Sequence, residues 1–281
     1  MINQIKKLLK SNSLIYQSYA ILRQLIAAFA SIKINTHSLQ EFNVRRKGGQ
    51  DLGEGNYRFY KNFLSSVNPN KLLHIIDIGA NDGWFAKVIF RFAPNSIVTS
   101  YEPLKSQFSN LNKLKEKYPN YRFFGKAVGA RPGSLPITEY GTSGLSSLKN
   151  FNAAYNYSEH YSLSLIDNYS VDVVTLDDEI NLILQGETNI ELVLKVDTQG
   201  FEYEVLKGAE NSIKAGIFKW VIIELMTVEK YESAHLYTDI MSILHTNGYS
   251  IWDIYPSYYE PDTLRLTEFD AIFFLDKLSN K

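Results

Sequence analysis

Apolar runs alternate with segments of helical periodicity along most of this chain. Strands are predicted at 72–78, 97–102, 121–128, 190–197, 218–225, 249–255 and 268–275. Helices are predicted at 83–92, 104–118, 201–214 and 229–247, with a shorter one at 56–66. Two further short strands, at 134–140 and 170–176, flank a long polar loop. The alternation predicts an α/β fold, with a mostly parallel sheet and helices on both of its faces.

The last two predicted strands have no helix between them. They are joined by the loop 256–267, so we expect them to pair antiparallel and to give a seven-stranded sheet an antiparallel edge strand. Residues 36–55 are polar and contain glycines, which is typical of a connector. We therefore predict two parts, an N-terminal helical extension with its connector at 1–55 and a main domain at 56–281.

The first 35 residues contain an apolar run, 20–30, that follows three lysines. Arg23 interrupts this run, and a central arginine costs at least about 2.5 kcal/mol in a membrane span. The segment therefore predicts neither a signal peptide nor a span, but an amphipathic helix. Two interpretations stay open: a helix packed on the domain or on a partner subunit, or a basic helix in peripheral contact with a membrane. We predict a cytoplasmic protein, membrane-associated in the second case.

Composition narrows the classes of function. The chain has 281 residues with a formal net charge of −1, which offers no basic face for nucleic acid. It has no cysteine, and none of its five histidines forms a His-x-x-x-His pair. We therefore predict no metal centre and no nucleic-acid partner. The oligomeric state stays open.

Segment 73–84 combines a buried strand, a glycine turn and a helix start. Asp77 stands near the end of the strand, and the turn reads Gly79-x-Asn81-x-Gly83. Glu102 follows the next strand, where an acid can accept hydrogen bonds from ribose hydroxyls. The turn lacks the third glycine of dinucleotide-binding motifs, which place a pyrophosphate at the helix start. The pattern therefore favours S-adenosylmethionine, which carries no phosphate, over NAD.

Three blocks of the sequence resemble the FkbM-type family of class I S-adenosylmethionine-dependent methyltransferases. They are residues 77–83, Glu102-Pro103, and 194–202 with its continuation 204–209; residues 175–178 form a weaker fourth block. The resemblance covers residues 72–275 and implies a Rossmann-like methyltransferase fold. Family members often have Val-Glu where this chain has Thr198-Gln199, which removes a carboxylate. The cofactor contacts that we predict are Asp77, Gly79, Asn81, Gly83, Glu102 and Ala127.

The resemblance implies O-methylation of a hydroxyl on a glycan, a glycan-like molecule or a secondary metabolite. Two alternatives are kept: a non-catalytic binding module with this fold, and an NAD-dependent oxidoreductase. The predicted catalytic residues are Asp197, Lys195 and Glu224, because the crevice of an open α/β sheet lies at the carboxyl ends of its strands. Lys195 and Asp197 share one face of their strand. They either form an ion pair that only supports packing or stand beside the acceptor hydroxyl. Glu224 either faces the crevice or caps the next helix.

Other candidates are weaker. The hydroxyl-rich loop 141–147 either closes over the cavity or is a plain exposed turn. The tyrosines of 255–259 are expected in a loop, where they stack on a sugar or lie on the surface. His160 is a candidate base in a polar loop, whereas His74 begins its strand at the wrong end of the sheet. Glu202 is expected in the first turn of a helix, where negative charge is favoured by about 0.3–1 kcal/mol.

Overall fold

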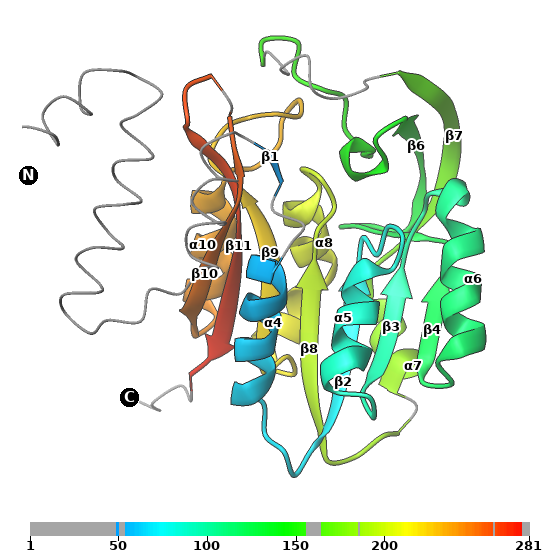
Figure 1. Ribbon diagram of the computed structural model, residues 1–281, viewed down its shortest axis with the longest axis vertical. Coiled ribbons are helices and arrows are strands. Elements are labelled where there is room, and N and C mark those ends of the chain that lie inside the picture. The colour runs from blue at the N-terminus through cyan, green and yellow to red at the C-terminus, as the bar shows by residue number, and fades with distance from the viewer. Residues whose placement is uncertain (1–48, 51–53, 156–163, 185, 261, 277–281) are drawn as a thin grey trace, which may run out of the picture.

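The main sheet of the computed structural model has eight strands in the order β1-β10-β11-β9-β8-β2-β3-β4 (Figure 1). The structure describes residues 49–50, 54–155, 164–184, 186–260 and 262–276. The parallel strands are β2 (Leu72–Ile78), β3 (Ile97–Tyr101), β4 (Tyr121–Phe124), β8 (Ile190–Val196) and β9 (Trp220–Met226). The others are β1 (Gly49–Gln50), β10 (Tyr249–Tyr259) and β11 (Leu266–Leu275). The predicted fold class is confirmed.

Helices cover both faces of this sheet. One face carries α4 (Glu54–Ser66), α5 (Trp84–Phe92) and α6 (Phe108–Lys117), and Figure 1 shows α4 and α5 in front of the strands. The opposite face carries α7 (Leu176–Leu184), α8 (Glu202–Gly208), α9 (Glu210–Lys214) and α10 (Tyr237–Thr246). Single turns of 3₁₀ helix, η1 (Lys105–Gln107) and η2 (Ser143–Leu145), lie in loops.

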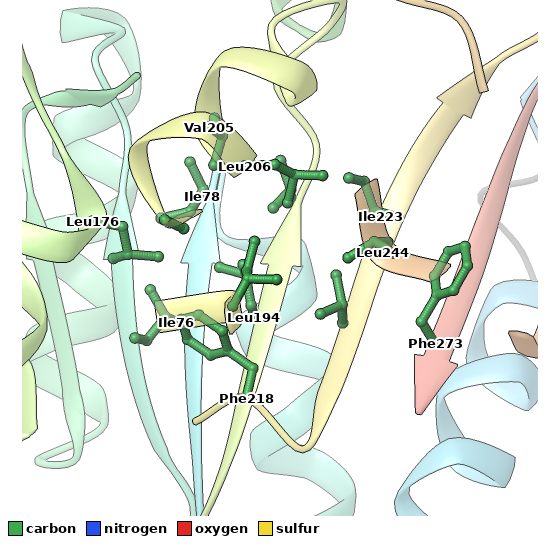
Figure 2. Packing of buried hydrophobic residues seen from close by; sticks show 14 of the residues in the cluster. Ile76, Ile78, Leu176, Leu194, Val205, Leu206, Phe218, Ile223, Leu244 and Phe273 are labelled. Carbon is green, nitrogen blue, oxygen red and sulfur yellow. The ribbon is translucent and has the colours of Figure 1, made fainter. Parts of the chain in front are cut away.

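Two apolar cores separate the sheet from these helix layers. Ile75 of β2 belongs to the core under α4–α6, and its neighbour Ile76 belongs to the core under α7–α10. The second core includes Leu194, Val205 and Leu244, which Figure 2 shows converging from β8, α8 and α10. Because parallel strands are buried on both faces, they read as continuous apolar runs in the sequence. This is why the central strands could be predicted well.

A second, three-stranded sheet has the order β5-β7-β6. Its strands are β5 (Ala127–Val128), β6 (Gly133–Tyr140) and β7 (Leu165–Val174). The predicted strand 121–128 is therefore two strands in different sheets, since β4 pairs with β3 and β5 pairs with β7. Between them a Cβ on Gly125 would lie 2.6 Å from the Phe108 ring. Because β7, the partner of β5, is distant along the chain, local periodicity could not show that residues 121–128 divide into two strands.

Four other predictions need correction. Strand β11 is antiparallel to both of its neighbours, β9 and β10, and lies two places inside the edge, because β10 and the short β1 lie outside it. The predicted helix 201–214 divides at Ala209 into α8 and α9, and the predicted helix 229–247 begins only at Tyr237. Helix α7 is not among the predicted elements, and the strand predicted at 170–176 ends at Val174 as part of β7. Thr175 is followed three residues later by Asp178, a spacing typical of a helix N-terminus. That signal could have revealed it.

The predicted N-terminal extension lies almost wholly outside the described residues, and the boundary at residue 55 stays a prediction. Within the part of the chain that the structure describes, no helix is both long and apolar enough to cross a membrane.

Candidate active site

A cavity of about 430 Å³ opens along the carboxyl ends of the parallel strands. Six neighbouring strands each bring polar groups to its wall. These are Glu102 after β3, Gly79 after β2, Asp197 after β8, Glu224 in β9, Asp270 in β11 and Ser257 in β10. Strands lie about 4.8 Å apart in a sheet, so this wall extends for roughly 24 Å.

The turn after β2 has the left-handed backbone that its glycines predict. The φ angles are +80° at Gly79, +47° at Asn81 and +77° at Gly83. A Cβ on Gly79 would lie 1.8 Å from the Asp197 carbonyl oxygen, and one on Gly83 would lie 2.2 Å from Leu114 Cδ1. Both glycines are therefore required by packing within the protein, not only by approach of a ligand. Gly79 and Asn81 line the cavity, while Gly83 packs against α6.

Glu102 lies at the floor of the cavity and is buried. The Asn81 N–H donates to its Oε2 at 2.6 Å, and the Leu104 N–H donates to its Oε1 at 2.8 Å. Burial raises the pKa of Glu102 to about 7, although these two backbone donors act in the opposite direction. Each oxygen keeps a second lone pair for a hydroxyl donor. The geometry suits the ribose-binding role predicted for Glu102.

Asp77 is fully buried and lies behind the cavity wall, in contact with Lys195. Lys195 Nζ is 3.1 Å from Asp77 Oδ1 and 3.5 Å from Asp197 Oδ2, and it donates to the Gly79 carbonyl at 3.1 Å. Burial by itself would lower the pKa of Lys195, but the two carboxylates outweigh it and raise the pKa above its ordinary value. Lys195 is therefore a permanent cation and not a proton acceptor. Any effect of Asp77 on a ligand would pass through Lys195.

Asp197 presents its carboxylate to the cavity, with 37 % of the side chain exposed. Gln199, at the position where relatives often carry Glu, holds it in place. Its Nε2 donates to Asp197 Oδ1 at 3.1 Å and to Glu224 Oε2 at 2.7 Å, while its Oε1 accepts from the Tyr231 hydroxyl at 3.1 Å. Gln199, the residue that departs from the family pattern, therefore links the predicted catalytic carboxyls of Asp197 and Glu224 through an uncharged amide.

Glu224 faces the cavity, so the alternative in which it caps a helix is wrong. Its register partner on β11 is Asp270, which also lines the cavity and which we did not single out from the sequence. Burial and the surrounding carboxylates raise the pKa of Glu224, and burial raises that of Asp270 to about 8. An acid inside the apolar run 269–273 was the available signal for Asp270, the same signal that identified Glu224.

The hydroxyl-rich loop 141–147 is part of the site and not a plain exposed turn. Ser143 donates to Asn81 Oδ1 at 3.0 Å, and Ser147 donates to the Gln199 carbonyl at 2.7 Å. Ala127, at the start of β5, lines the same side of the cavity. The loop is thus joined both to the glycine turn and to the end of β8.

Two further candidates have structural roles. Glu202 accepts hydrogen bonds from the N–H groups of Thr198 and Gly200, which confirms its helix-terminal role. His74 is fully buried and bonded to Glu187 and Thr99, and so is structural. His160 lies outside the described residues.

The tyrosines of 255–259 do not lie in a loop, because β10 continues to Tyr259 and buries Tyr255 and Tyr258. Apolar packing against the domain thus extends the strand beyond its predicted end.

The aromatic part of the wall was also not predicted. Tyr60 of α4 lies 6.0 Å from the Trp84 ring and 5.1 Å from the Phe85 ring, and all three residues line the cavity. These rings come from α4 and α5, which lie in front of the strands in Figure 1, and the Phe85 ring lies 5.5 Å from Lys195 Nζ. The only sequence signal was the aromatic spacing of the short helix.

This site fits S-adenosylmethionine. Gly79 and Asn81 of the turn line the cavity, Glu102 offers two acceptor oxygens for ribose hydroxyls, and the polar loop closes the same end. The strand order with β11 inserted antiparallel, together with this site, defines a Rossmann-like class I methyltransferase.

Comparison with the sequences of known proteins agrees. The family model for the methyltransferase FkbM domain matches residues 77–251. Methyltransferase 1 of Beauveria bassiana is 25 % identical over 67 % of this chain and 76 % of its own length. Methyltransferase sdnD of Sordaria araneosa is 25 % identical over 63 % and 73 %. Aeropyrum pernix fibrillarin with bound S-adenosyl-L-methionine has a TM-score of 0.40 at 11 % identity, covering 78 % of this chain and 76 % of that one.

The chain belongs to the FkbM methyltransferase family. Its cofactor is S-adenosylmethionine, and the alternative of an NAD-dependent oxidoreductase is set aside.

Proposed function

We propose that this methyltransferase transfers a methyl group to a hydroxyl of a glycan, a glycan-like molecule or a secondary metabolite. The observation that carries the proposal is Asp197, a carboxylate exposed to the cavity and fixed between Lys195 and Gln199. A hydroxyl is a weak nucleophile, so a positioned base contributes about 10²–10⁴-fold to the rate. When bound, S-adenosylmethionine supplies an electrophilic methyl group.

The residues of the site divide the remaining work. Glu102 and the Gly79 turn hold the cofactor end. Asp197 would take the proton of the acceptor hydroxyl as that oxygen bonds to the methyl carbon, while the methyl–sulfur bond breaks and S-adenosylhomocysteine is the leaving group. Lys195 keeps its proton and stabilises the negative charge of Asp197, so it orients the base but does not replace it. Glu224, linked to Asp197 through Gln199, belongs to the acceptor side.

The mixed lining of the cavity supports an acceptor like a sugar. Tyr60, Trp84 and Phe85 contribute aromatic rings to the wall, which also carries carboxyl, amide and hydroxyl groups. A sugar has apolar C–H faces and polar edges, and it matches a cavity that offers both kinds of surface. Location in the cytoplasm and contact of residues 1–35 with a membrane stay predictions.

The test is turnover of S-adenosylmethionine, labelled with ¹³C in the methyl group, against a panel of saccharides and alcohols. Formation of S-adenosylhomocysteine measures the rate, and ¹³C NMR of the product identifies the methylated atom. We expect O-methyl products and a loss of about 10²–10⁴-fold in kcat for Asp197→Asn, with S-adenosylhomocysteine affinity retained. Asp253→Asn, on the exposed part of β10, is the matched control.

A normal rate in Asp197→Asn would remove the base from the proposal, and methyl groups on nitrogen or carbon would remove the hydroxyl acceptor. Cofactor binding without turnover of any acceptor would favour the alternative of a non-catalytic module.

A further inference from the structure

The end of the cavity farthest from Glu102 is formed by Glu224, Asp270 and Ser257. Glu224 and Asp270 are register partners on the adjacent strands β9 and β11, and Ser257 comes from the next strand, β10. Glu102 and the Gly79 turn lie at the other end, three and two strands from β9. The two ends therefore contact different molecules. The end at Glu102 binds the cofactor, and the end at β9–β10 binds the acceptor.

Hydrogen-bond acceptors at this end lack donors. Ser257 is only 6 % exposed, and its Oγ has no hydrogen-bond partner among the described residues. Within the same described ranges, no donor reaches the Asp270 carboxyl, and the Gln199 amide alone donates to Glu224. A buried polar group without a partner destabilises the folded protein, because it has lost its hydrogen bonds to water. The arrangement is therefore completed by a ligand that brings several donors.

Among the described residues, no lysine or arginine forms an ion pair with Glu224 or Asp270, and Lys195 acts on Asp270 only from farther away. Lys195 is held by Asp77 and by the Gly79 carbonyl, each at 3.1 Å. Lys230, the other buried lysine in this region, pairs with Glu268 at 2.6 Å. Burial first, and then the neighbouring carboxylates, raise the pKa of both Glu224 and Asp270, although the charge of Lys195 acts in the opposite direction on Asp270.

We propose that Glu224, Asp270 and Ser257 form a subsite for a protonated amine on the acceptor. The methylated molecule is then an amine-bearing alcohol, such as an amino sugar. An ammonium group brings three donors, no acceptor and one positive charge, which are the properties that this end lacks. A neutral hydroxyl brings one donor and no charge. The inference rests on the proposed function, because it takes this end of the cavity as the acceptor end.

An amine could also come from the cofactor, since S-adenosylmethionine carries an amino group. The test therefore uses protein already loaded with S-adenosylhomocysteine. The probes are the positional isomers of amino-deoxyglucose, each compared with its neutral N-acetylated form, and calorimetry measures Kd at constant ionic strength.

For at least one isomer we expect the free amine to bind about tenfold tighter than its N-acetylated form, as charge-assisted hydrogen bonds permit. The double variant Glu224→Gln with Asp270→Asn should reduce this preference to less than twofold, and Ser257→Ala should weaken it. Asp253→Asn should keep it. Affinity for S-adenosylhomocysteine should stay within twofold in every variant, which also shows that the variants are folded.

Binding of the amine should release protons, because the ammonium stabilises the ionised carboxyls. Calorimetry in two buffers of different ionisation enthalpy measures this release. If no isomer shows a preference for the free amine, the amine subsite is wrong, while O-methyl transfer to a neutral alcohol is tested separately by turnover. If the double variant loses S-adenosylhomocysteine affinity, the occupant is the cofactor and the inference is also wrong.

Discussion

At the scale of single residues, the site is organised by how each charge is compensated. Asp77 lies behind the cavity wall and pairs with Lys195, which lines the cavity, and Lys195 also contacts the exposed carboxylate of Asp197. Gln199 joins Asp197 to Glu224 without adding charge. A glutamate at position 199 would place a third carboxylate between these two, and like charges at such distances repel strongly. The chain's departure from the family pattern is thus consistent with its acidic surroundings.

Glu102 carries the first prediction. Because burial raises its pKa to about 7, the carboxyl is half protonated near neutrality, and ribose hydroxyls favour the ionised form. Affinity for S-adenosylhomocysteine should therefore rise between pH 6 and pH 8 and then level off. Glu102→Gln should lower the affinity by about tenfold or more, since it removes charge-assisted hydrogen bonds, and should abolish the pH dependence. Calorimetric titration at each pH measures both effects; a pH dependence that persists in the variant would contradict the assignment.

At the scale of elements, the turn between β2 and α5 is held in place from two sides. Gly79 lets the turn approach the end of β8, and Gly83 lets the start of α5 approach α6. The same closeness places Lys195 within reach of the Gly79 carbonyl. The turn that contacts the cofactor therefore also packs against the end of β8 and, at the start of α5, against α6. Its glycines have this structural role whether or not a ligand is bound.

Gly79→Ala tests how much the contact between the turn and the end of β8 contributes to stability. The left-handed backbone costs an alanine about 1–2 kcal/mol, and the overlap with the Asp197 carbonyl adds about 1–3 kcal/mol. We expect the free energy of unfolding to fall by about 2–5 kcal/mol on these two costs, measured by urea denaturation. Gly133→Ala is the control, because a Cβ there meets nothing within 4 Å. Equal stability of the two variants would show that the turn relaxes freely.

At the scale of the whole molecule, the sheet gathers acids from many strands into one partly desolvated region. The pKa is raised to about 7 in Glu102 and Glu202, to about 8 in Asp270, and well above the ordinary value in Glu224. Burial is the first cause in each case. Such clusters mark functional sites more often than structural ones, and they also affect the stability of the fold.

The free energy of unfolding should fall as the pH rises from 6.5 to 8. In this range the folded chain still holds protons on these carboxyls, whereas the unfolded chain has released them, so a rise in pH favours unfolding. His74, whose pKa is lowered by burial, has the opposite effect only below about pH 6.5, the ordinary histidine pKa. Urea denaturation at each pH measures the slope. Asp270→Asn should flatten it between pH 7 and 8, and Asp253→Asn should not; a flat profile for the unaltered chain would contradict the prediction.

Much of this protein could be predicted from local pattern. The central parallel strands read as continuous apolar runs because both of their faces are buried, and the acids that follow them, Glu102 and Asp197, stood out against those runs. The glycine turn was clear because few other residues adopt its backbone. These features depend on the residues themselves and their immediate neighbours, so the order of elements and the end of the sheet that holds the site followed from the sequence.

Only the tertiary structure decided how those residues are partnered. Asp77 and Asp197 both end in reach of Lys195, but burial of one and exposure of the other separate their roles. Asp270 and Ser257 join the site because β11 inserts between β9 and β10, a pairing between strands that are distant along the chain. The physical reason is that strand order, burial and charge compensation are set by contacts between remote segments, which leave little trace in local periodicity.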